Sequence, residues 1–565
     1  MKFADLPEAC KGETETNYQV LAFDYQRSPD QFGPARRKPV VVVGAGPVGL
    51  SLAIDLAQRE VPVVLLDNDF RLSTGSRAIC FAKRTLEIFD RLGCGDRMVK
   101  KGVSWNLGRV FFGDQQIYQF DLLPESGHER PAFINLQQYF VEGYLAERAA
   151  QLPLIDLRWH NRVIGVEQAD DHVIVSIDTP DGPYRIAAEY VAACDGSRSS
   201  VRQLIGEESK GRVFRDRFLI ADVKMKLEQP AERWFWFDPP FHRNQSVLLH
   251  MQPDGVWRID FQLGWDANPE EEKKPEKIIP RVKEMLANTS MKDAEFELVW
   301  ASVYTFACLR MDKFRHGRIF FAGDSAHGVS PFGARGANSG VQDAENLAWK
   351  LAAVLRGNAP DALLDSYASE REYAADENIL NSTRATDFIT PKSEISRIFR
   401  DAVLDLSKQH PFARTLVNSG RLSVPSTLVE SPLNTSETDS KCEHMVPGAP
   451  ATDAPVRLPG GGSSWLLRQL GADFTALVLT SGADEKHLDR LRDYAGTTGQ
   501  LSVLAVATNP TVKADVIDSE DLVAKRYELQ PGSVVLLRPD QHVCARGGLS
   551  DQTWIPAALR RALAA

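Results

Sequence analysis

Apolar residues between positions 39 and 70 predict a strand, a helix and a second strand in quick succession. Val40–Val43 is an unbroken β-branched run, which is typical of a strand buried on both faces. Val61–Leu66 is a second run of this kind. Between them, apolar side chains recur at helical spacing at Leu50, Ala53, Ile54 and Ala57. We therefore expect this segment to form one βαβ unit.

The middle of the chain changes to the alternating pattern of half-buried strands. Residues 216–305 indicate a mostly antiparallel sheet with one helix at about 276–287. The βα pattern then returns, with a short buried strand at Arg318–Ala322 and a long helix from about Asn338. The pattern predicts an α/β fold that is interrupted by a β-rich insertion.

Two polar segments flank this region. Residues 1–38 are aperiodic, whereas residues 423–463 are rich in Pro, Ser, Thr and Gly, as linkers are. Residues 464–565 have βα content of their own and are long enough for a separate small domain. Its expected elements are strands at Phe474–Leu479, Leu501–Ala507 and Ser533–Leu537 and helices near 484–494 and 555–564.

Composition narrows the class of protein. The 565 residues are 43% hydrophobic and 25% charged, and 66 Lys and Arg against 76 Asp and Glu give a net charge of −10. We find no basic run for a nucleic acid, and no apolar run near the roughly 18 residues of a membrane span. The N-terminal segment lacks the apolar stretch of a secretory signal. The seven cysteines are scattered without metal-ligand spacing, which favours a cytoplasmic protein with free thiols and no metal site.

The first candidate site follows the strand Val40–Val43. Gly44-x-Gly46-x-x-Gly49 includes Ala45 and Pro47 and opens the predicted helix. Glycines at this spacing allow a tight turn, a close approach of a pyrophosphate to the backbone, and close helix packing. The helix N-terminus supplies unpaired N–H groups for the anion. Asp67 ends the second strand, where a carboxylate accepts hydrogen bonds from ribose hydroxyls. The ordered set predicts a dinucleotide-binding site.

Two later motifs distinguish among dinucleotides. One is Cys194-Asp195-Gly196 with the segment to Arg202, and the other is Gly323-Asp324 with the loop Pro331–Asn338. With these motifs, the chain from about 38 to 400 resembles the class A flavoprotein monooxygenases, which are single-component FAD-dependent aromatic hydroxylases. Residues 76–93 and 135–145 are similar to segments of the phenol-type and 3-(3-hydroxyphenyl)propionate-type members.

The resemblance implies roles for individual residues. It implies contacts to a non-covalent FAD from Gly44, Ala45, Gly46, Pro47, Gly49, Asp67, Arg77, Gln138, Asp195, Asp324, Pro331, Gly336, Ala337 and Asn338. Asp67 would bind the adenosine ribose and Asp324 the ribityl chain. Either Gln137 or Gln138 could point toward FAD. Asp195 lies in a motif that the family links to both FAD and NAD(P)H.

The resemblance also implies a domain division. We expect a Rossmann-like FAD-binding domain at 39–215 and 306–422, interrupted by a β-rich substrate-binding region at 216–305. An N-terminal arm (1–38), a linker (423–463) and a thioredoxin-like domain (464–565) complete the chain. The last domain lacks a Cys-x-x-Cys pair, and Cys544 is a lone thiol, so we expect packing or homodimer support rather than redox chemistry.

The implied activity is hydroxylation of a phenolic substrate ortho or para to its hydroxyl, with NAD(P)H and O2, through a C4a-hydroperoxyflavin. His250 and Arg258 on the strands of the insertion are candidates to bind a substrate oxygen, although exposure to solvent is the favoured interpretation for both. No catalytic base can be named. The same chemistry on a polycyclic or polyketide substrate, including epoxidation, is an alternative, and a non-catalytic flavin-binding scaffold is another.

Overall fold

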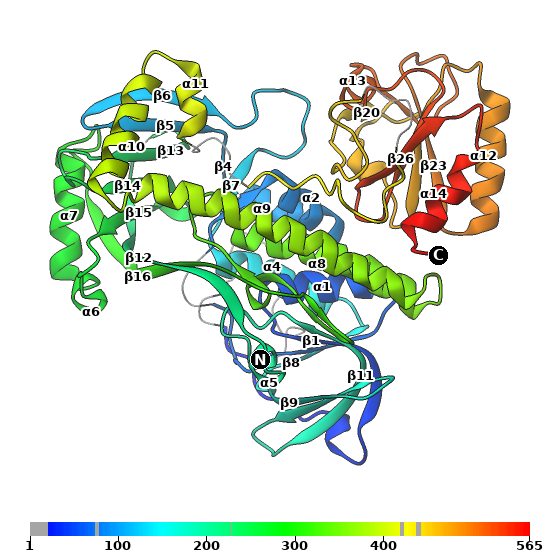
Figure 1. Ribbon diagram of the computed structural model, residues 1–565, viewed down its shortest axis with the longest axis horizontal. Helices are drawn as coiled ribbons and strands as arrows, with labels where there is room; N and C mark the ends of the chain where they lie inside the picture. Colours follow the sequence, from blue (N-terminus) through cyan, green and yellow to red (C-terminus); the bar gives the residue numbers. More distant parts are fainter. Residues whose placement is uncertain (1–17, 19–20, 74–77, 228, 418–422, 437–441) are drawn as a thin grey trace.

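A computed structural model describes residues 18, 21–73, 78–227, 229–417, 423–436 and 442–565. The ribbon shows a first sheet at the bottom, a second sheet at the upper left and a C-terminal unit at the upper right (Figure 1). The long helices α8 (Gly336–Leu355) and α9 (Asp365–Ile389) run across the centre between these parts. No described helix is long and apolar enough to cross a membrane.

The first sheet contains the predicted βαβ unit. Strand β1 pairs in parallel with β2 on one side and with β11 on the other, so it lies at the centre of the sheet. The path of the sheet is β17 (Arg315–His316), β18 (Ile319–Phe321), β11 (Tyr184–Ala193), β1 (Arg36–Val43), β2 (Val63–Leu66) and β8 (Ile155–Arg158), with β10 (Val173–Asp178) on β11 and β9 (Arg162–Gln168) on β10. Strand β10 forms an antiparallel hairpin with β11, and β11 continues into the central sheet beside β1.

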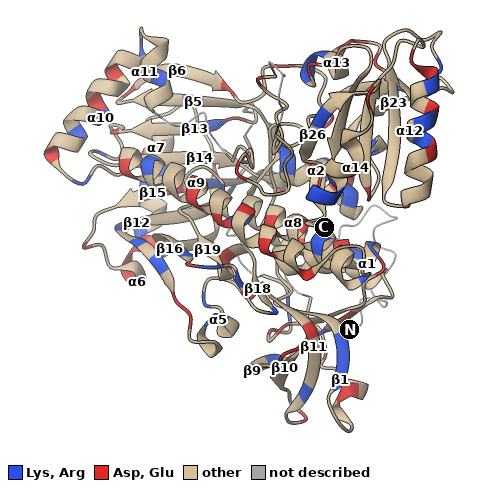
Figure 2. Cartoon of the chain, turned by 45° about the vertical axis from the view of Figure 1, so that its right-hand side comes forward, with Lys and Arg blue, Asp and Glu red and all other residues tan. Residues whose placement is uncertain are grey.

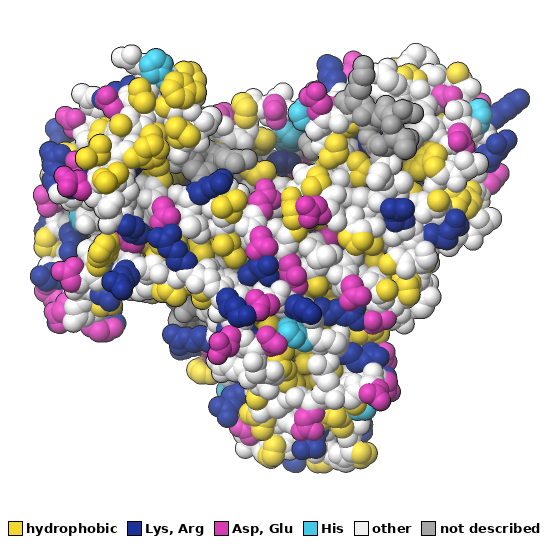
Figure 3. Space-filling view, viewed as in Figure 1, with side chains coloured by type: hydrophobic (Ala, Val, Ile, Leu, Met, Phe, Trp, Pro, Cys, Tyr) yellow, Lys and Arg dark blue, Asp and Glu magenta, His cyan; other side chains and the backbone are white. Residues whose placement is uncertain are grey.

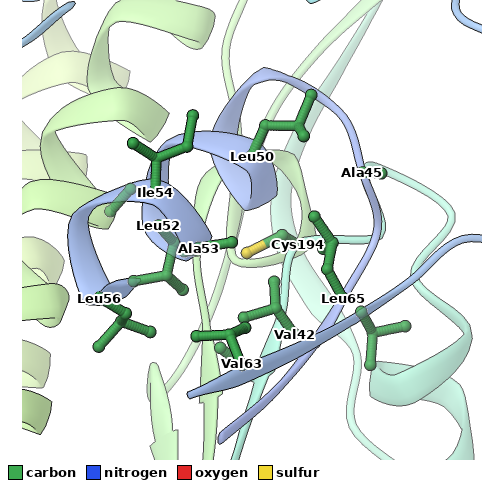
Figure 4. Packing of buried hydrophobic residues seen from close by; sticks show 14 of the residues in the cluster. Val42, Ala45, Leu50, Leu52, Ala53, Ile54, Leu56, Val63, Leu65 and Cys194 are labelled. Atoms are coloured by element: carbon green, nitrogen blue, oxygen red, sulfur yellow. The ribbon is translucent and has the colours of Figure 1, made fainter. Parts of the chain in front are cut away.

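Helix α1 (Pro47–Gln58) buries its apolar face against this sheet. Its leucines and Ile54 are fully buried, as are Val42 and Leu65 on the strands below them. Cys194, which follows β11, lies in the same layer (Figure 4). Burial raises the pKa of the Cys194 thiol well above its usual range, so this cysteine is an inert packing residue.

The second sheet is formed by the β-rich insertion together with a hairpin from earlier in the chain. In order, its strands are β19 (His327–Gly328), β16 (Phe296–Met311), β12 (Ser209–Met225), β15 (Val256–Leu263), β14 (Ser246–Met251), β13 (Arg233–Phe237), β5 (Leu107–Phe112) and β6 (Gln115–Asp121). Residues 107–121 were expected in the first part of the FAD-binding domain, but they join the second sheet, because β5 pairs in parallel with β13.

The two faces of the second sheet pack against different neighbours. Trp257, Ile259 and Phe261 of β15 contact helix α7 (Pro275–Ala287), close to the predicted 276–287. On the other face, which we call the inner face, Leu248 and Phe235 form one cluster with Phe332 of the loop before α8. The inner face therefore packs on the loop before α8, on Ile389 of α9 and on Leu404 of the helix that follows.

Smaller elements connect the two sheets. A three-stranded sheet consists of β3 (Cys80–Ala82), β7 (Phe133–Asn135) and β4 (Val103–Trp105). The remaining helices of this region are α2 (Lys83–Leu92), α3 (Gly95–Lys101), α4 (Gln138–Ala150), α5 (Ser200–Leu204), α6 (Pro269–Glu272), α10 (Glu394–Ser407) and α11 (Pro411–Leu416).

The C-terminal unit has a seven-stranded mixed sheet flanked by helices. Its strands are β21 (Ser463–Trp465), β20 (Pro455–Arg457), β24 (Val516–Ile517), β23 (Leu501–Ala507), β22 (Phe474–Leu479), β25 (Ser533–Leu537) and β26 (Val543–Gly548), and its helices are α12 (Glu485–Thr498), α13 (Leu522–Arg526) and α14 (Trp554–Ala562). The three predicted strands are confirmed at their predicted bounds. The predicted α/β class, with an interrupted parallel sheet and a C-terminal α/β unit, is also confirmed.

The segment 423–463 differs from the detached linker that its composition indicated. β20 lies within it and joins the C-terminal sheet. Leu428 and Leu433 are buried, and the backbone N–H of Thr435 donates to the carbonyl of Cys544. Some of its apolar residues are therefore used for packing, whereas Val424 and Val429 are exposed.

A buried charge cluster joins the C-terminal unit to α8 and α9. Arg538 Nη1 lies 2.5 Å from Glu370 Oε1, and Lys350 Nζ lies 2.7 Å from Glu370 Oε2. Trp349 Nε1 donates to Asp540 Oδ2 at 3.0 Å, and Arg84 of α2 donates to the Asp540 carbonyl at 2.7 Å. Figure 2 shows the basic residues of α2 beside the C-terminal unit. Because these charges are buried and mutually paired, the two units are held in one arrangement.

Candidate functional site

The glycine motif forms a tight turn between β1 and α1. Gly44 has φ of +103°, and its N–H donates to the Leu66 carbonyl at 2.7 Å. A Cβ on Gly44 would lie 2.5 Å from the Cys194 carbonyl oxygen, and a Cβ on Gly49 would lie 1.9 Å from the Gly44 oxygen. These two glycines are therefore required by the packing of the protein itself.

Gly46 differs from them because it faces open space. A Cβ at this position would meet no heavy atom within 4 Å. Gly46 is the N-cap of α1, and no side chain caps the helix there. The first-turn N–H groups and the positive end of the helix dipole can therefore receive an anion such as a pyrophosphate.

Asp67 closes β2 next to this turn. Its Oδ2 accepts a hydrogen bond from the Ala45 N–H at 2.6 Å, and its Oδ1 accepts one from the Asp69 N–H at 2.8 Å. Burial raises the pKa of the carboxyl, and the two backbone N–H groups oppose that shift. Each oxygen keeps a further lone pair, so the carboxylate can brace the turn and still accept ribose hydroxyls.

The second motif lies directly behind the glycine turn. Asp195 Oδ2 accepts from Ser200 Oγ at 3.0 Å and from the Val201 N–H at 3.1 Å. Asp195 Oδ1 is buried and has no hydrogen-bond partner among the described residues. Arg202 donates to the Ser325 carbonyl at 2.7 Å, which ties this motif to the third.

A buried acid on α8, Asp343, fixes the backbone of the third motif, Gly323-Asp324. Asp343 accepts from the Gly323 N–H at 2.9 Å, from Arg371 at 2.6 Å, and lies 2.6 Å from His327 Nε2. Burial opposes ionisation of Asp343, but His327 and Arg371 lower its pKa to about 2. His327 is thus a positioning residue, whereas the neighbouring Asp324 is exposed.

The loop Pro331–Asn338 is hydrogen-bonded to β3 through its last residue. Asn338 Oδ1 accepts from the Ala82 N–H at 2.8 Å, and its Nδ2 donates to the Cys80 carbonyl at 2.9 Å. A Cβ on Gly336 would lie 3.7 Å or more from its neighbours, with Asp324 Oδ1 at 4.0 Å. The side-chain amide of Asn338 is used in these hydrogen bonds to β3. The loop can therefore contact a ligand through its backbone at the start of α8.

The structure places Gln137 and Gln138, either of which could point toward FAD according to the sequence, on different sides. Gln138 Oε1 accepts from the Ala78 N–H at 3.1 Å, so this side chain faces the segment after β2. Gln137 is buried, and its Nε2 donates to the Pro253 carbonyl at 3.4 Å, beside the second sheet. Gln138 is therefore the one on the side of the first sheet. Arg77, the other predicted contact in this region, lies outside the described residues.

The favoured expectation for His250 and Arg258, exposure to solvent, is wrong. They are 1% and 2% exposed, because the polar positions of β14 and β15 lie on the inner face. Arg258 makes two hydrogen bonds of 2.8 Å to Asp222. His250 Nε2 lies 3.1 Å from Asp260 Oδ2, and burial, with Arg233 nearby, lowers the pKa of His250 to about 4.

Sequence reasoning missed Arg233, which directly opposes His250 in the strand register. The available signal was its position two residues before Phe235 and four before Phe237, on what alternation indicates is an apolar face. A charged residue in such a row requires either a partner or a function.

Comparison with known proteins agrees with this geometry. A family model described as an FAD binding domain matches residues 37–382. A probable NADH-specific resorcinol 4-hydroxylase of Rhodococcus jostii is 35% identical over 341 residues, 59% of this chain and 62% of that protein. A 6-methylpretetramide 4-monooxygenase of Streptomyces rimosus is 31% identical over 554 residues, 94% of each chain.

Solved structures show the same fold. The flavin-dependent monooxygenase PieE, solved with FAD and substrate, has a TM-score of 0.77 and 22% identity, and the match covers 94% of this chain and all of that one. The p-nitrophenol 4-monooxygenase PnpA from Pseudomonas putida has a TM-score of 0.59 and 26% identity, covering 69% and 98%. The family match confirms the predicted FAD cofactor. The open space at Gly46 and the unpartnered Asp195 Oδ1 fit a bound dinucleotide. No group of three or more metal-ligating side chains occurs in the described part of the chain.

Proposed function

The chain belongs to the class A flavin-dependent aromatic hydroxylases, and we propose that it hydroxylates a phenolic ring ortho or para to its hydroxyl, using FAD, NAD(P)H and O2. The observation that carries this proposal is the inner face of the second sheet. There, aromatic side chains and the buried polar groups of Arg233 and His250 lie beside the Pro331–Asn338 loop. Apolar surroundings with a few polar groups suit a phenol.

The residues that the resemblance assigns to FAD retain those roles as proposals. Gly46 and the first turn of α1 would bind the pyrophosphate, Asp67 the adenosine ribose, and Asp324 the ribityl chain. Bound FAD would supply the redox chemistry, taking a hydride from NAD(P)H and delivering one oxygen atom of O2 to the ring. It is held without a covalent bond, so acid precipitation should release all of it.

The loop before α8 would serve the flavin end of the cofactor. Its backbone N–H groups and the N-terminus of the 20-residue helix α8 stabilise negative charge that develops there. The protein's own contribution is thus to bind and orient the flavin and the substrate, and Phe332 of the loop joins the apolar cluster of the inner face.

A polycyclic or polyketide substrate is the second candidate. The relative that matches along 94% of both chains is named for a polycyclic substrate. In contrast, the relatives named for single-ring phenols, such as the para-nitrophenol 4-monooxygenase of a Pseudomonas strain, match 59–65% of this chain. The aromatic crowding of the inner face favours the smaller ring.

The test is NAD(P)H oxidation by the purified FAD-loaded protein with a panel of single-ring phenols and a panel of polycyclic phenols. We expect a suitable single-ring phenol to accelerate flavin reduction about tenfold or more, a barrier change of roughly 1.4 kcal/mol. The product should contain one atom from labelled O2. Stimulation by polycyclic compounds alone would select the second candidate, and product oxygen from water would exclude both.

We also propose a cytoplasmic homodimer. Hydrophobic side chains gather at the upper left of Figure 3, where Figure 1 places α10 and α11. Five large apolar side chains of these two helices are each more than half exposed: Ile395, Ile398, Phe399, Phe412 and Leu416. Exposed groups of apolar side chains commonly mark contact surfaces between proteins. In a dimer with a two-fold axis, the same patch would be buried on both copies. Light scattering should give twice the chain mass, and the Phe399→Ser and Phe412→Ser double variant should give the monomer. A monomeric wild-type protein at micromolar concentration would contradict this.

A further inference from the structure

Arg84 is a buried arginine that joins three parts of the fold. It is the second residue of α2, directly after β3, and it is 3% exposed. Its Nη2 donates to the Asp540 carbonyl of the C-terminal unit at 2.7 Å and to the two carboxylate oxygens of Glu345 on α8 at 3.1 and 3.2 Å. Its Nη1 donates to Gln541 Oε1 at 3.3 Å. A buried guanidinium is costly unless its donors are paired, so these hydrogen bonds fix the position of Arg84.

The same face of α8 also binds β3. Asn338 and Glu345 are seven residues apart, about two helical turns, and therefore lie on one face of α8. Asn338 Oδ1 accepts from the Ala82 N–H at 2.8 Å, and its Nδ2 donates to the Cys80 carbonyl at 2.9 Å. Glu345 binds Arg84, two residues after Ala82. Helix α8 therefore holds the end of β3 and the start of α2 together.

Arg84 connects the C-terminal unit to the loop Pro331–Asn338 through this arrangement. On one side, Asp540 and Gln541 of the C-terminal unit accept hydrogen bonds from it. On the other side, β3 ends two residues before it and is bound to Asn338, the last residue of the loop. Figure 2 shows α2 beside the C-terminal unit. Since the side chains in this series are buried, a displacement of Arg84 should be transmitted to β3 and to the loop.

A second arginine between the two units makes different contacts. Arg526 of α13 donates to the carbonyls of Ser126 and Gly127, each at 2.6 Å. These two residues lie in the segment between β6 and β7. No described residue of β3 or α8 is hydrogen-bonded to Arg526. Both arginines attach the C-terminal unit to the rest of the chain, but of the two only Arg84 contacts the elements that carry the loop.

We propose that Arg84 is a positioning residue for oxygen transfer, and that through it the C-terminal unit holds the loop Pro331–Asn338 in place against β3. This inference rests on the proposed function, in which the loop serves the flavin end of FAD, and it gives the C-terminal unit a part in the reaction. Arg84 itself touches neither FAD nor the substrate. It acts by fixing the backbone of the segment to which the loop is bound.

The position of the loop affects which of two reactions consumes O2. In hydroxylation, NAD(P)H, a proton, O2 and the substrate give NAD(P)+, water and a product with one new C–O bond. In the uncoupled reaction, NAD(P)H, a proton and O2 give NAD(P)+ and H2O2, and no bond to the ring is formed. Only the first reaction needs the ring to be aligned with the oxygen donor, and a misplacement of about 1 Å can slow an aligned step about a hundredfold. A displaced loop should therefore favour H2O2.

The first experiment measures coupling, which is the amount of hydroxylated product formed per NAD(P)H consumed, with H2O2 measured in parallel. In the FAD-loaded enzyme, with a phenol that stimulates NAD(P)H oxidation, Arg84→Met should lower coupling about threefold or more and raise H2O2 by the matching amount. The KM for the phenol should stay within about twofold of the wild type, since the second sheet is unchanged. Arg84→Lys keeps a donor for Asp540 and Glu345 and should restore part of the coupling.

Arg526→Met is the matched control, because it removes an arginine that joins the same two units. It should lower the thermal stability but keep wild-type coupling. Gln541→Met removes one acceptor of Arg84 by a change in the C-terminal unit alone, and it should lower coupling by a smaller factor. Wild-type coupling in folded, FAD-loaded Arg84→Met would overturn the proposal, as would an equal loss of coupling in Arg526→Met. If Arg84→Met does not fold, wild-type coupling in Gln541→Met would overturn it.

A second measurement does not depend on a phenol. Hydrogen exchange of the FAD-loaded protein, followed by mass spectrometry, reports how firmly each backbone segment is held. Arg84→Met should reduce the protection of residues 80–84 and 331–340, whereas Arg526→Met should reduce it around residues 126–127 only. A wild-type enzyme that hydroxylates no phenol would refute the proposed function, and loss of protection of the loop in Arg84→Met would still support its positioning by Arg84. Unchanged protection in Arg84→Met would overturn the inference and leave the proposed function in place.

Discussion

Replacing Gly46 with Ala tests whether the glycine turn serves a ligand or only the fold. Gly46 has ordinary backbone angles, with φ of −76°, and an added Cβ would meet no heavy atom of the protein within 4 Å. The methyl group would occupy only the space that we assign to the FAD pyrophosphate. The protein without FAD should therefore accept this change, while the protein with FAD should not.

The expected size of the effect follows from the bonds at risk. A hydrogen bond from a backbone N–H to a charged oxygen contributes about 1.5–3 kcal/mol, so displacing the pyrophosphate from one such donor should raise the FAD Kd by about one to two orders of magnitude. Ala is a poorer N-cap than Gly, which should cost the apoprotein less than about 1 kcal/mol. The loss of affinity should thus exceed the loss of stability.

Two other glycines provide controls in the same assay, which pairs fluorescence titration of the apoprotein with FAD and thermal unfolding without FAD. Gly460→Ala, far along the chain and also with nothing within 4 Å of an added Cβ, should change neither quantity. Gly49→Ala places its Cβ 1.9 Å from the Gly44 oxygen and should destabilise the apoprotein itself. The reasoning is refuted if Gly46→Ala binds FAD with wild-type affinity.

Four further predictions use other parts of the structure. Asp324→Ala should raise the FAD Kd by one to two orders of magnitude in equilibrium dialysis, because the ribityl hydroxyls lose a charged acceptor. Glu370→Gln leaves Arg538 and Lys350 without their shared anion and should lower the free energy of unfolding in urea by about 3–5 kcal/mol. Burial raises the pKa of Cys544 to about 12, so Cys544→Ser should keep the hydroxylation rate, and a loss of rate in a folded, FAD-loaded variant would indicate a working thiol. Folding lowers the pKa of His250 from its usual 6.5 to about 4, so between these two pH values the unfolded chain binds more protons than the folded chain. The free energy of unfolding should therefore fall as the pH drops from 6.5 to 4, and His250→Gln should reduce this pH dependence in urea unfolding.

Local sequence patterns were sufficient for the elements whose partners are close in the chain. The Val40–Leu66 unit and strands such as Phe474–Leu479 formed where β-branched runs predicted them, because each run is buried on both faces of a sheet. Pairing between distant segments was not predictable in this way. Strand β5 pairs with the neighbouring β6 and also with β13, which is more than a hundred residues further along, and no local pattern indicates the second partner.

The burial of the polar residues of the second sheet could not be predicted for a related physical reason. Alternation along Val256–Leu263 correctly separates Trp257, Ile259 and Phe261 from Arg258 and Asp260. The usual interpretation gives the polar set to water, as in a sheet with one solvated face. Here α7 covers the apolar face, and the polar face is turned toward the loops of the first sheet, so both faces are buried.

A polar row in that position must satisfy its charges internally or through a ligand. Arg258 does the former with Asp222, and Arg233 lacks an equivalent carboxylate among the described residues. The site is therefore determined by which face of the sheet meets the other domain, a property of the tertiary arrangement that the strand pattern does not carry.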